Sequence, residues 1–494
     1  MPFSFRLHRQ RRGRRAEVQN DPRSLLPLEL WRKIFSFNSF SDIRSLTLVC
    51  HTFRLIGQPF LFETFTLHPY ARPSGVRSQQ HRRRMIQRLQ FFQSTHIRPA
   101  VKECRLMALE DDKSLPSLRT MDDITDAVFD ALPCFPNLAT LVCRSVYFSR
   151  RCMTVLSALH VKVITLHSCF SDAHMSPDFS EVPFENITLK YPKRMGNSAD
   201  PRFLSLFLRS RQLQRLFAGP TDEILHAMIM AQPLPTLSVL DIPVTCVASL
   251  HFIQALSACR TLNALSLHSL NRNEQLPILS AVPDDFLPSL VSYRGPNNYF
   301  PLLRNSSLRA IEISIMCETE NLLKTLYELH GSTNLKSLSI RVSTVSSALL
   351  RSIHSSFPSL LTLIVKEPSL IPATCPSVFA SSGTVPSLRS LTFPLFVSDP
   401  NSFWIPSAFE INDTLSFFAN IYPQFLLTYP SLQRIQIVYN ERGTSLLWMR
   451  RTSNAPPHPR DEDVRVEVDA FSSSSEGRTL YLNEMKRLQA IRHK

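Results

Sequence analysis

The sequence predicts an α/β protein in which a short helical segment near the N-terminus precedes a long solenoid of parallel strands with helices outside. Three observations lead to this prediction. A three-position apolar pattern recurs down most of the chain, amphipathic helical stretches fill the intervals between its copies, and a compact apolar segment precedes them. Strands and helices that alternate at a regular interval are typical of a parallel sheet covered by helices.

The recurring pattern places apolar residues at a first position, a, and again at a+3 and a+5. From Leu138 to Leu432 the copies follow one another in eleven steps with a mean spacing of about 27 residues, within the roughly 20–29 residues of one-strand repeats. Positions a+3 and a+5 share one face of a strand because they lie two residues apart. The clear copies are Leu138-Leu141-Cys143, Leu237-Leu240-Ile242, Leu262-Leu265-Leu267, Leu308-Ile311-Ile313, Leu335-Leu338-Ile340, Leu360-Leu363-Val365, Leu388-Leu391-Phe393 and Leu432-Ile435-Ile437. Weaker copies are Phe62-Phe65-Leu67, Val101-Cys104-Leu106, Val161-Ile164-Leu166 and Phe184-Ile187-Leu189, and the poorest are Leu213-Leu216-Ala218 and Leu290-Tyr293-Gly295.

Helical patterns fill the intervals. A unit of one strand and one helix cannot bury its apolar face alone and needs neighbours on both sides, so we expect a solenoid over residues 61–445. The long interval after Phe62 holds a basic insertion, His81–Arg88, that we expect to continue as a helix through Phe92 and that is either a partner contact or neutral decoration. The other expected helices are Asp122–Leu132, Asp222–Ala231, Val247–Ala258, Glu320–His330 with Thr319 as its cap, and Ser346–Ser356.

The repeats resemble the leucine-rich-repeat family, whose strand segments read LxxLxLxxN/C. The resemblance implies a horseshoe-like solenoid with parallel strands inside and helices outside. The last consensus position matches at Cys169, Asn298 and Asn440, whereas most other copies depart from it. We therefore expect irregular repeats that lack much of the internal asparagine ladder.

Residues 23–60 form the N-terminal helical segment, and its apolar residues recur at helical spacing. Helix signals divide it. Pro27 and Glu29 suit a first turn, Ser41 and Asp42 indicate a second start, and Gly57 with Pro59 is expected to stop the last helix. On pattern alone, a small helical cap that completes a core outside this segment is the favoured interpretation, because apolar stripes usually form core.

The residues of this segment also resemble an F-box, through Leu26-Pro27-x-Glu29-Leu30, Ile34-Phe35, Asp42-Ile43, Leu46, Leu48-Val49-Cys50 and Phe53-Arg54, with Phe53 where the family more often has Trp. The resemblance implies a three-helix module that docks the Skp-type adaptor of a cullin–RING ubiquitin ligase. So small a module cannot bury all its apolar side chains, and leftover apolar surface marks a partner site. The residues expected to divide between the module's core and the adaptor contact are Leu26, Pro27, Leu30, Ile34, Phe35, Leu46, Val49, Cys50 and Phe53.

Composition argues against several classes of function. The 55 Lys and Arg against 40 Asp and Glu give a net charge of +15, and no apolar run approaches membrane-spanning length. Nucleotide-binding glycine loops, zinc-type Cys/His clusters and hydrolase signatures are absent from the sequence. We therefore expect no enzymatic activity, no cofactor, no metal and no membrane partner. Ten scattered cysteines and the lack of a secretory signal favour reduced thiols in a cytoplasmic and/or nuclear protein.

Both ends of the chain are polar. Residues 1–22 form a basic tail that we expect to be disordered, and it is a nuclear-localisation signal, a nucleic-acid patch or a solubilising tail. Since the tail lacks interleaved aromatic residues, nucleic acid is not expected as the main partner. Residues 446–494 form a polar tail with a candidate capping helix at Thr479–Arg492.

Position a+6 carries a basic or titratable residue in half of the units counted from Leu138. In an open curved sheet this position faces the concave surface, and Arg and Lys pair with carboxylates and phosphates. The set is either a site for an acidic or phosphorylated target segment or the ordinary solvated surface of a basic protein. Its members are Arg144, His167, Lys190, His268, Arg341 and Lys366.

These features predict a non-catalytic substrate-recognition adaptor. The N-terminal module would dock a Skp-type adaptor and, through it, a cullin–RING ligase, while the repeats hold an unknown protein target near the ubiquitin-carrying enzyme. Two alternatives remain. One is an interaction scaffold that is not coupled to degradation, and the weaker one is a nucleic-acid-binding protein led by the arginine tail.

Overall fold

The computed structural model describes residues 26–68, 76–107, 122–171, 179–191, 200–219, 223–269, 276–278, 282–283, 286–304, 306–329, 334–366, 387–394, 427–438 and 445–449. The chain divides into two compact units, Met1–Leu141 and Val142–Lys494. The predicted N-terminal tail, Asn440 and the candidate capping helix lie outside the described residues.

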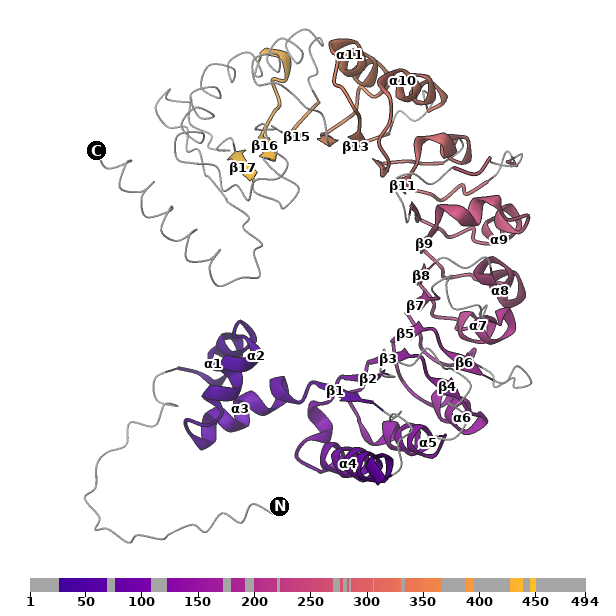
Figure 1. The fold of residues 1–494 in the computed structure, drawn as a ribbon. Helices are drawn as coiled ribbons and strands as arrows, with labels where there is room; N and C mark the ends of the chain where they lie inside the picture. Colours follow the sequence, from indigo (N-terminus) through magenta and orange to yellow (C-terminus); the bar gives the residue numbers. More distant parts are fainter. Residues whose placement is uncertain are drawn as a thin grey trace, which may run out of the picture. The chain divides into compact units, whose positions relative to one another are not determined.

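The first unit begins with three short helices, α1 (Leu28–Ser36), α2 (Phe40–Leu46) and α3 (His51–Leu61) (Figure 1). Side-chain caps begin two of them. Ser39 Oγ accepts a hydrogen bond from the Asp42 amide at 3.3 Å, and Cys50 Sγ accepts one from the Phe53 amide at 3.4 Å. The second helix therefore begins behind Ser39, earlier than the signal at Ser41 and Asp42 indicated, because the hydroxyl of Ser39 reaches the unpaired amide first.

The predicted ends of two of these helices were wrong. Pro27 is the N-cap of α1 and precedes its first turn. Helix α3 continues through Gly57 and Pro59 to Leu61. Proline removes only one backbone hydrogen bond near the end of a helix, and Gly57 is buried where α3 crosses α2, so here the glycine serves close packing.

The first unit continues with β1 (Thr64–Leu67), α4 (Val76–Gln93), the 3-10 turn η2 (Arg98–Ala100), β2 (Glu103–Met107), α5 (Asp122–Ala131) and the 3-10 turn η4 (Leu132–Cys134). Strands β1 and β2 pair in parallel, with Phe65 opposite Cys104. The helix predicted from the basic insertion is confirmed as α4. Figure 1 shows α4 on the outer side of these two strands.

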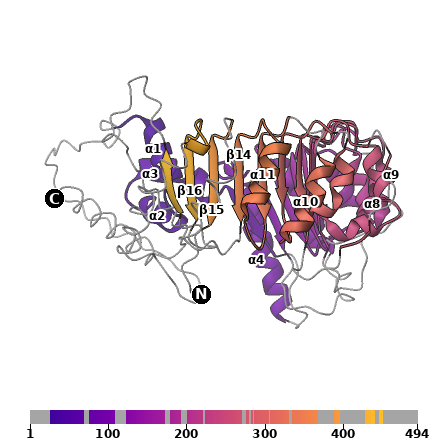
Figure 2. The same ribbon diagram turned by 90° about the horizontal axis from the view of Figure 1, so that it is seen from above.

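In the second unit, parallel strands follow one another in chain order, and Figure 2 shows β14, β15 and β16 side by side. The strand β3 (Thr140–Arg144) begins in the first unit and ends in the second. The others are β5 (Val163–His167), β7 (Asn186–Lys190), β8 (Arg215–Ala218), β9 (Val239–Pro243), β10 (Ala264–His268), β11 (Ser292–Gly295), β12 (Ala310–Ile313), β13 (Ser337–Arg341), β14 (Thr362–Lys366), β15 (Ser390–Pro394) and β16 (Arg434–Val438). The last strand, β17 (Ser445–Met449), is antiparallel to β16, and β4 (Tyr147–Phe148) pairs with β6 (Phe170–Ser171) in a separate sheet.

Helices cover one face of this sheet, as Figure 1 shows. They are α6 (Arg150–Ser157), α7 (Pro201–Leu208), α8 (Glu223–Ala231), α9 (Phe252–Ser257), α10 (Thr319–Glu328) and α11 (Ser347–Ser356), with 3-10 turns η6 (Val244–Ala248) and η7 (Asn297–Leu303). Helices α6 and α7 were not predicted, although Ser149 and Asp200 cap them. Thr319 was wrongly assigned as a cap: its hydroxyl donates to the Thr344 carbonyl at 2.8 Å instead.

In each predicted copy of the apolar pattern, including the two poorest, positions a+3 and a+5 lie on one strand. Strand pairing places the same position of successive repeats side by side, so that at a+3 Leu240 is opposite Leu265 and Leu363 is opposite Leu391. The side chains at a+3 and a+5 are buried in every copy for which they are described. Positions a+2, a+4 and a+6 therefore face away from the helices, and we call this surface of the second unit the open face.

Cysteine and tyrosine side chains make hydrogen bonds between neighbouring units, where regular repeats would have an asparagine ladder. Cys169 Sγ donates to the Cys143 carbonyl at 3.2 Å, and Tyr191 Oη donates to the Cys169 carbonyl at 3.1 Å. Burial raises the pKa of the Cys169 thiol to about 12, which keeps it a neutral donor. Asn298, predicted as a ladder residue, is exposed. Its buried neighbour Asn297 accepts from Cys317 Sγ at 3.0 Å and takes that place because the repeat is irregular there.

A buried histidine makes the stability of the second unit dependent on pH. His354 on α11 is 8% exposed, its Nε2 lies 3.3 Å from Tyr429 Oη, and burial lowers its pKa from 6.5 to about 4. Between these values the unfolded chain binds a proton that the folded chain excludes. The free energy of unfolding is thus highest above pH 6.5 and falls as the pH drops towards 4.

We predict that the His354→Gln variant will lose less stability than the wild type between pH 7 and pH 5. The expected difference is about 2 kcal/mol, since each pH unit of separation between two pKa values is worth about 1.4 kcal/mol. Urea unfolding at the two pH values measures it. Equal losses in both proteins would contradict the role given to His354, and His160→Gln, at an exposed position, serves as the control.

Candidate functional site

Three side chains form the core of the N-terminal helical module. Phe35, Ile43 and Ile56 are buried, and Trp31, Leu46 and Phe53 pack partly buried against them. The ring of Phe53 lies 4.9 Å from that of Trp31 and 5.5 Å from that of Phe35, between centroids. Of the residues predicted to divide between core and partner contact, Phe35, Leu46 and Phe53 thus belong to the core.

Other members of the predicted set lie on the surface. Leu30, Ile34 and Val49 are 45%, 39% and 68% exposed, and Pro27 is exposed as well. Leu26 and Cys50 are half-buried, and Cys50 also caps α3. The structure adds exposed apolar residues that the predicted contact set did not include: Leu28, Phe37, Phe40, Leu48 and Leu55.

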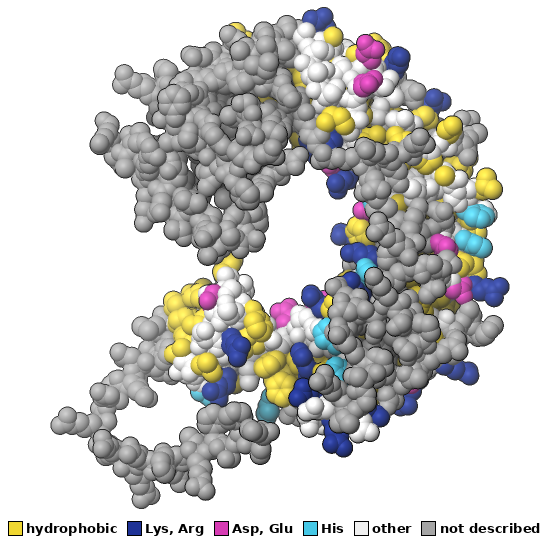
Figure 3. Space-filling view, in the orientation of Figure 1, with side chains coloured by type: hydrophobic (Ala, Val, Ile, Leu, Met, Phe, Trp, Pro, Cys, Tyr) yellow, Lys and Arg dark blue, Asp and Glu magenta, His cyan; other side chains and the backbone are white. Residues whose placement is uncertain are grey.

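We call the eight exposed apolar residues of the module the docking set: Leu28, Leu30, Ile34, Phe37, Phe40, Leu48, Val49 and Leu55. Figure 3 shows hydrophobic side chains, in yellow, gathered over these helices. A module of three short helices that leaves so many large apolar side chains in water has the surface of a protein that binds a partner.

A family model described as F-box domain matches residues 24–58. The chain contains an F-box domain. F-box domains in general bind Skp-type adaptors and serve as adaptors in cullin–RING ubiquitin ligases. The sequence resemblance is thereby confirmed, and the interpretation of this segment as a mere cap for the repeats is set aside.

Comparison with other proteins adds less. A search of curated proteins returns no match. Among solved structures, the crystal structure of a TLR13–ssRNA13 complex matches with 16% identity and a TM-score of 0.35, over 69% of this chain and 44% of that one. The chain thus corresponds to less than half the length of that protein.

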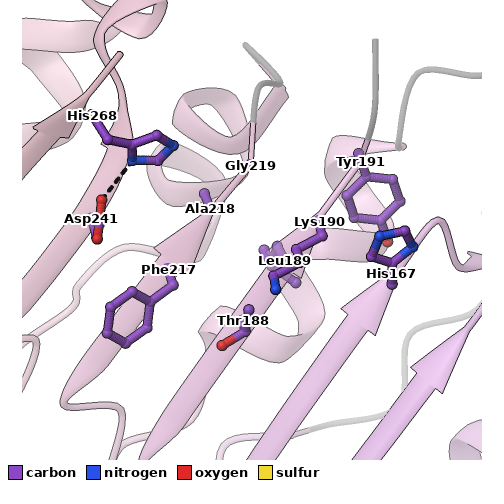
Figure 4. Close-up of a pocket in the computed structure, with 10 residues that line it drawn as sticks. All are labelled: His167, Thr188, Leu189, Lys190, Tyr191, Phe217, Ala218, Gly219, Asp241 and His268. Carbon is purple, nitrogen blue, oxygen red and sulfur yellow. Dashed lines mark hydrogen bonds and ion pairs between the residues drawn. The ribbon is translucent and has the colours of Figure 1, made fainter. Parts of the chain in front are cut away.

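Beyond the F-box, the structure brings three of the six predicted open-face residues to one hollow of about 500 Å³. His167, Lys190 and His268 line it, together with Phe217 and Asp241 (Figure 4). They come from the ends of β5, β7 and β10 and from the neighbouring β8 and β9. The aromatic ring of Phe217, 38% exposed, gives the hollow an apolar wall beside its charged groups.

One pair within the hollow is fixed internally. His268 Nδ1 lies 2.7 Å from Asp241 Oδ1 on the adjacent strand. The contact sets the orientation of the imidazole and occupies one carboxylate oxygen. Gly219 brings β8 close to β7, because a Cβ added there would lie 3.3 Å from Lys190 Cα. The hollow therefore combines an exposed ammonium group, two imidazoles and a ring on adjacent strands.

The remaining predicted residues are not part of the hollow. Lys366 Nζ lies 2.7 Å from Glu312 Oε1, and Arg341 donates to the Ser314 carbonyl at 3.2 Å. Arg144 lies at the end of β3, half-buried. Arg341 therefore joins neighbouring units, and Lys366 reaches across β13 to a carboxylate on β12, so both side chains hold units together as well as contributing charge.

The open face as a whole is basic. Its described carboxylates in the second unit are Asp241 and Glu312. Against them stand the cations Arg144, Lys190, Arg215, Arg294, Arg341, Lys366 and Arg434. Figure 3 shows dark-blue side chains along the strand side of this unit. A surface with this excess of positive charge attracts acidic segments.

The described residues contain neither a cluster of metal-ligating side chains nor a helix that could span a membrane. In these ranges no three His, Cys, Asp or Glu side chains are placed to hold a metal ion. No helix within the same part of the chain is long and apolar enough to cross a bilayer.

Proposed function

We propose that the protein is a non-catalytic substrate-recognition adaptor of a cullin–RING ubiquitin ligase. The observation that carries the proposal is the docking set on the F-box, which leaves Leu30, Ile34 and Val49 available to a Skp-type adaptor. The basic open face, with its hollow around Lys190, supports the capture of an acidic or phosphorylated protein segment. Ubiquitin transfer is then accelerated by the raised effective concentration and orientation of the target.

Co-purification with a Skp-type adaptor tests the docking step. We predict that Leu30→Asp with Ile34→Asp will weaken adaptor capture by about 100-fold or more, because each change places a carboxylate where an apolar anchor must be desolvated. Both side chains are already exposed, so the fold should be retained, and circular dichroism checks this. Leu250→Asp, at a position 93% exposed in the second unit, is the matched control. Wild-type protein that captures no adaptor would overturn the docking role.

The same purification reports on the target. Lys190→Glu should keep the adaptor and lose proteins that are enriched with the wild type, whereas Lys324→Glu, a charge reversal on the exposed side of α10, should lose neither. Targets that accumulate when the F-box variant replaces the wild type would support the coupling to degradation. Captured proteins whose half-lives stay unchanged would instead support the scaffold alternative.

A further inference from the structure

Helix α4 exposes a basic surface that the proposed function does not use. Among its residues 79–93, the exposed side chains are Gln79, Gln80, Arg82, Arg83, Arg84, Gln87, Arg88, Gln90 and Phe91. All but the last are Arg or Gln, and the whole helix contains no acidic residue. A solvated helix surface ordinarily mixes both signs of charge, so this composition calls for a partner.

The exposed side chains form two lines along the helix. Gln80, Arg84 and Arg88 follow one another at intervals of four residues, and Arg83, Gln87 and Gln90 follow beside them. Successive members of a line are about 4.5–6 Å apart along the axis, given a rise of 1.5 Å per residue. Guanidinium and carboxamide groups, each able to make two parallel hydrogen bonds, thus lie side by side over about three turns.

The opposite side of α4 fixes the helix to its unit. Phe92 is buried and its ring centroid lies 4.3 Å from that of Phe65 on β1. Nearer the N-terminal end, His81 Nε2 is hydrogen-bonded to the His68 carbonyl at 2.9 Å. Since the helix is held at both places, its arginines are presented from a rigid support and not from a flexible tail.

Among the described residues, the arginines on these two lines have no carboxylate partner. No described residue lies within ion-pair or hydrogen-bond distance of the side chains of Arg83, Arg84 and Arg88. Cations elsewhere in the same unit do have carboxylate partners: Lys102 Nζ lies 3.3 Å from Glu63 Oε1, and Arg105 Nε lies 2.8 Å from Glu103 Oε1. The charge of α4 is therefore available to an external polyanion.

The chemistry of the exposed side distinguishes between polyanions. An amphipathic helix that binds a membrane surface inserts its apolar face, and the apolar face of α4 packs against its own unit. Protein interfaces are usually centred on buried aromatic and Arg anchors, and beside its arginines the exposed side of α4 offers only Phe91. Arg and Gln are the side chains that pair with phosphates, guanine and adenine. The major groove of B-DNA admits an α-helix, whereas that of A-form RNA is too narrow.

We propose that α4 binds double-stranded DNA along the major groove, where Arg84 and Arg88 contact the phosphates and the Gln side chains reach the base edges. Nucleic acid was not expected as the main partner because the N-terminal tail lacks aromatic residues, and the proposal departs from that expectation because it rests on a different element, α4. It is independent of the ligase role. The DNA would hold the protein, with any adaptor and target bound to it, at a chromosomal location.

Fluorescence anisotropy of the full chain with a labelled 20-base-pair DNA duplex tests the proposal. Arg84→Gln with Arg88→Gln should weaken binding at least 10-fold near physiological salt and should make the slope of log K against log salt shallower by about 1.8, since each phosphate contact contributes about 0.9. Arg209→Gln with Arg260→Gln removes two exposed arginines from the second unit and should change neither quantity. The N-terminal tail is present in all three proteins, so its contribution is common to them.

Binding measurements with other polyanions test the alternatives to DNA. A duplex RNA bound as tightly as the DNA, or phosphatidylserine vesicles or polyglutamate that bind with the same loss in the α4 variant, would overturn the assignment to DNA. So would an α4 variant that binds DNA as well as the wild type. Because α4 is separate from the docking set, the variant should still capture the Skp-type adaptor, which distinguishes a failure of this inference from a failure of the ligase role.

Discussion

Replacing Phe207 with alanine is expected to lower the free energy of unfolding of the second unit by about 3–5 kcal/mol. The side chain on α7 is fully buried. Its ring centroid lies 5.2 Å from those of Phe179 and Phe203 and 6.1 Å from that of Phe184. Its removal leaves a cavity and also breaks aromatic pairs that are worth about 0.5–1.5 kcal/mol each.

Chemical denaturation measures the loss in free energy of unfolding, and hydrogen exchange of the native protein shows which elements are affected. Since a repeat contacts only its neighbours, amides of β7, β8 and α8 should lose more protection than those of β13 and α11. Phe217→Ala removes a phenyl ring from the open face, where Phe217 is 38% exposed, and should lower the free energy of unfolding far less. Equal losses in the two variants would show that burial of Phe207 does not stabilise this unit.

A single methyl group at Gly57 is expected to destabilise the F-box by about 1 kcal/mol and to weaken adaptor capture with it. Inside a helix, Gly→Ala normally gains about 1 kcal/mol. Here the new Cβ would collide with Thr47 Cγ2 and lie 3.1 Å from Phe35 Cε1, and overpacking costs about 1–3 kcal/mol. The steric term therefore outweighs the helix propensity, and Gly57→Val should be worse.

The neighbour that causes the collision provides the test. Thr47→Ser removes Cγ2 but keeps the hydroxyl that donates to the Arg44 carbonyl at 2.7 Å. Combined with Gly57→Ala, it should restore most of the lost stability, measured as protection of α3 amides from exchange. Arg54→Ala, on the exposed side of α3, is the control for helix propensity. A Gly57→Ala protein that is more stable than the wild type would rule out the close approach of α3 to α2.

The strands could be predicted because their pattern is local and repeated. Even the poor copy Leu290-Tyr293-Gly295 forms β11, since β10 and β12 provide hydrogen-bonding partners on both sides. Tyr293 Oη donates to the Pro296 carbonyl at 2.8 Å, which satisfies its buried hydroxyl. A weak strand between two strong ones is thus supported by its neighbours, and pattern alone underestimates it.

The division of the F-box into core and surface could not be predicted in the same way. Ile34 and Phe35 are adjacent and similarly apolar, yet one is 39% exposed and the other is buried. The difference depends on how α1 is rotated against α3, which no short-range pattern specifies. The prediction that Gly57 ends the last helix was wrong for a related reason. Glycine is typical of helix ends, but here it allows the close packing of α3 on α2, which the sequence does not show.

Part of the hollow on the open face could be predicted from the repeat pattern, and the rest depends on how the strands are arranged in space. Its basic members follow from their place in the repeat, whereas Phe217 and Asp241 join them only because the ends of β7 to β10 come together. The pairing of His268 with Asp241 connects positions on adjacent strands and is invisible until strand order and register are known.

The alignment of like positions across the sheet has a consequence for how such a chain can change. Tyr293 is opposite Ile311 after a short connection, and Leu391 is opposite Ile435 after a long one, with the same register in both. Connections can therefore grow, shrink or be exchanged without displacing a residue of the open face. Each unit is in this sense an interchangeable part, and a graft of β7 to β10 with their helices should carry the chemistry of the hollow into another array of the same kind.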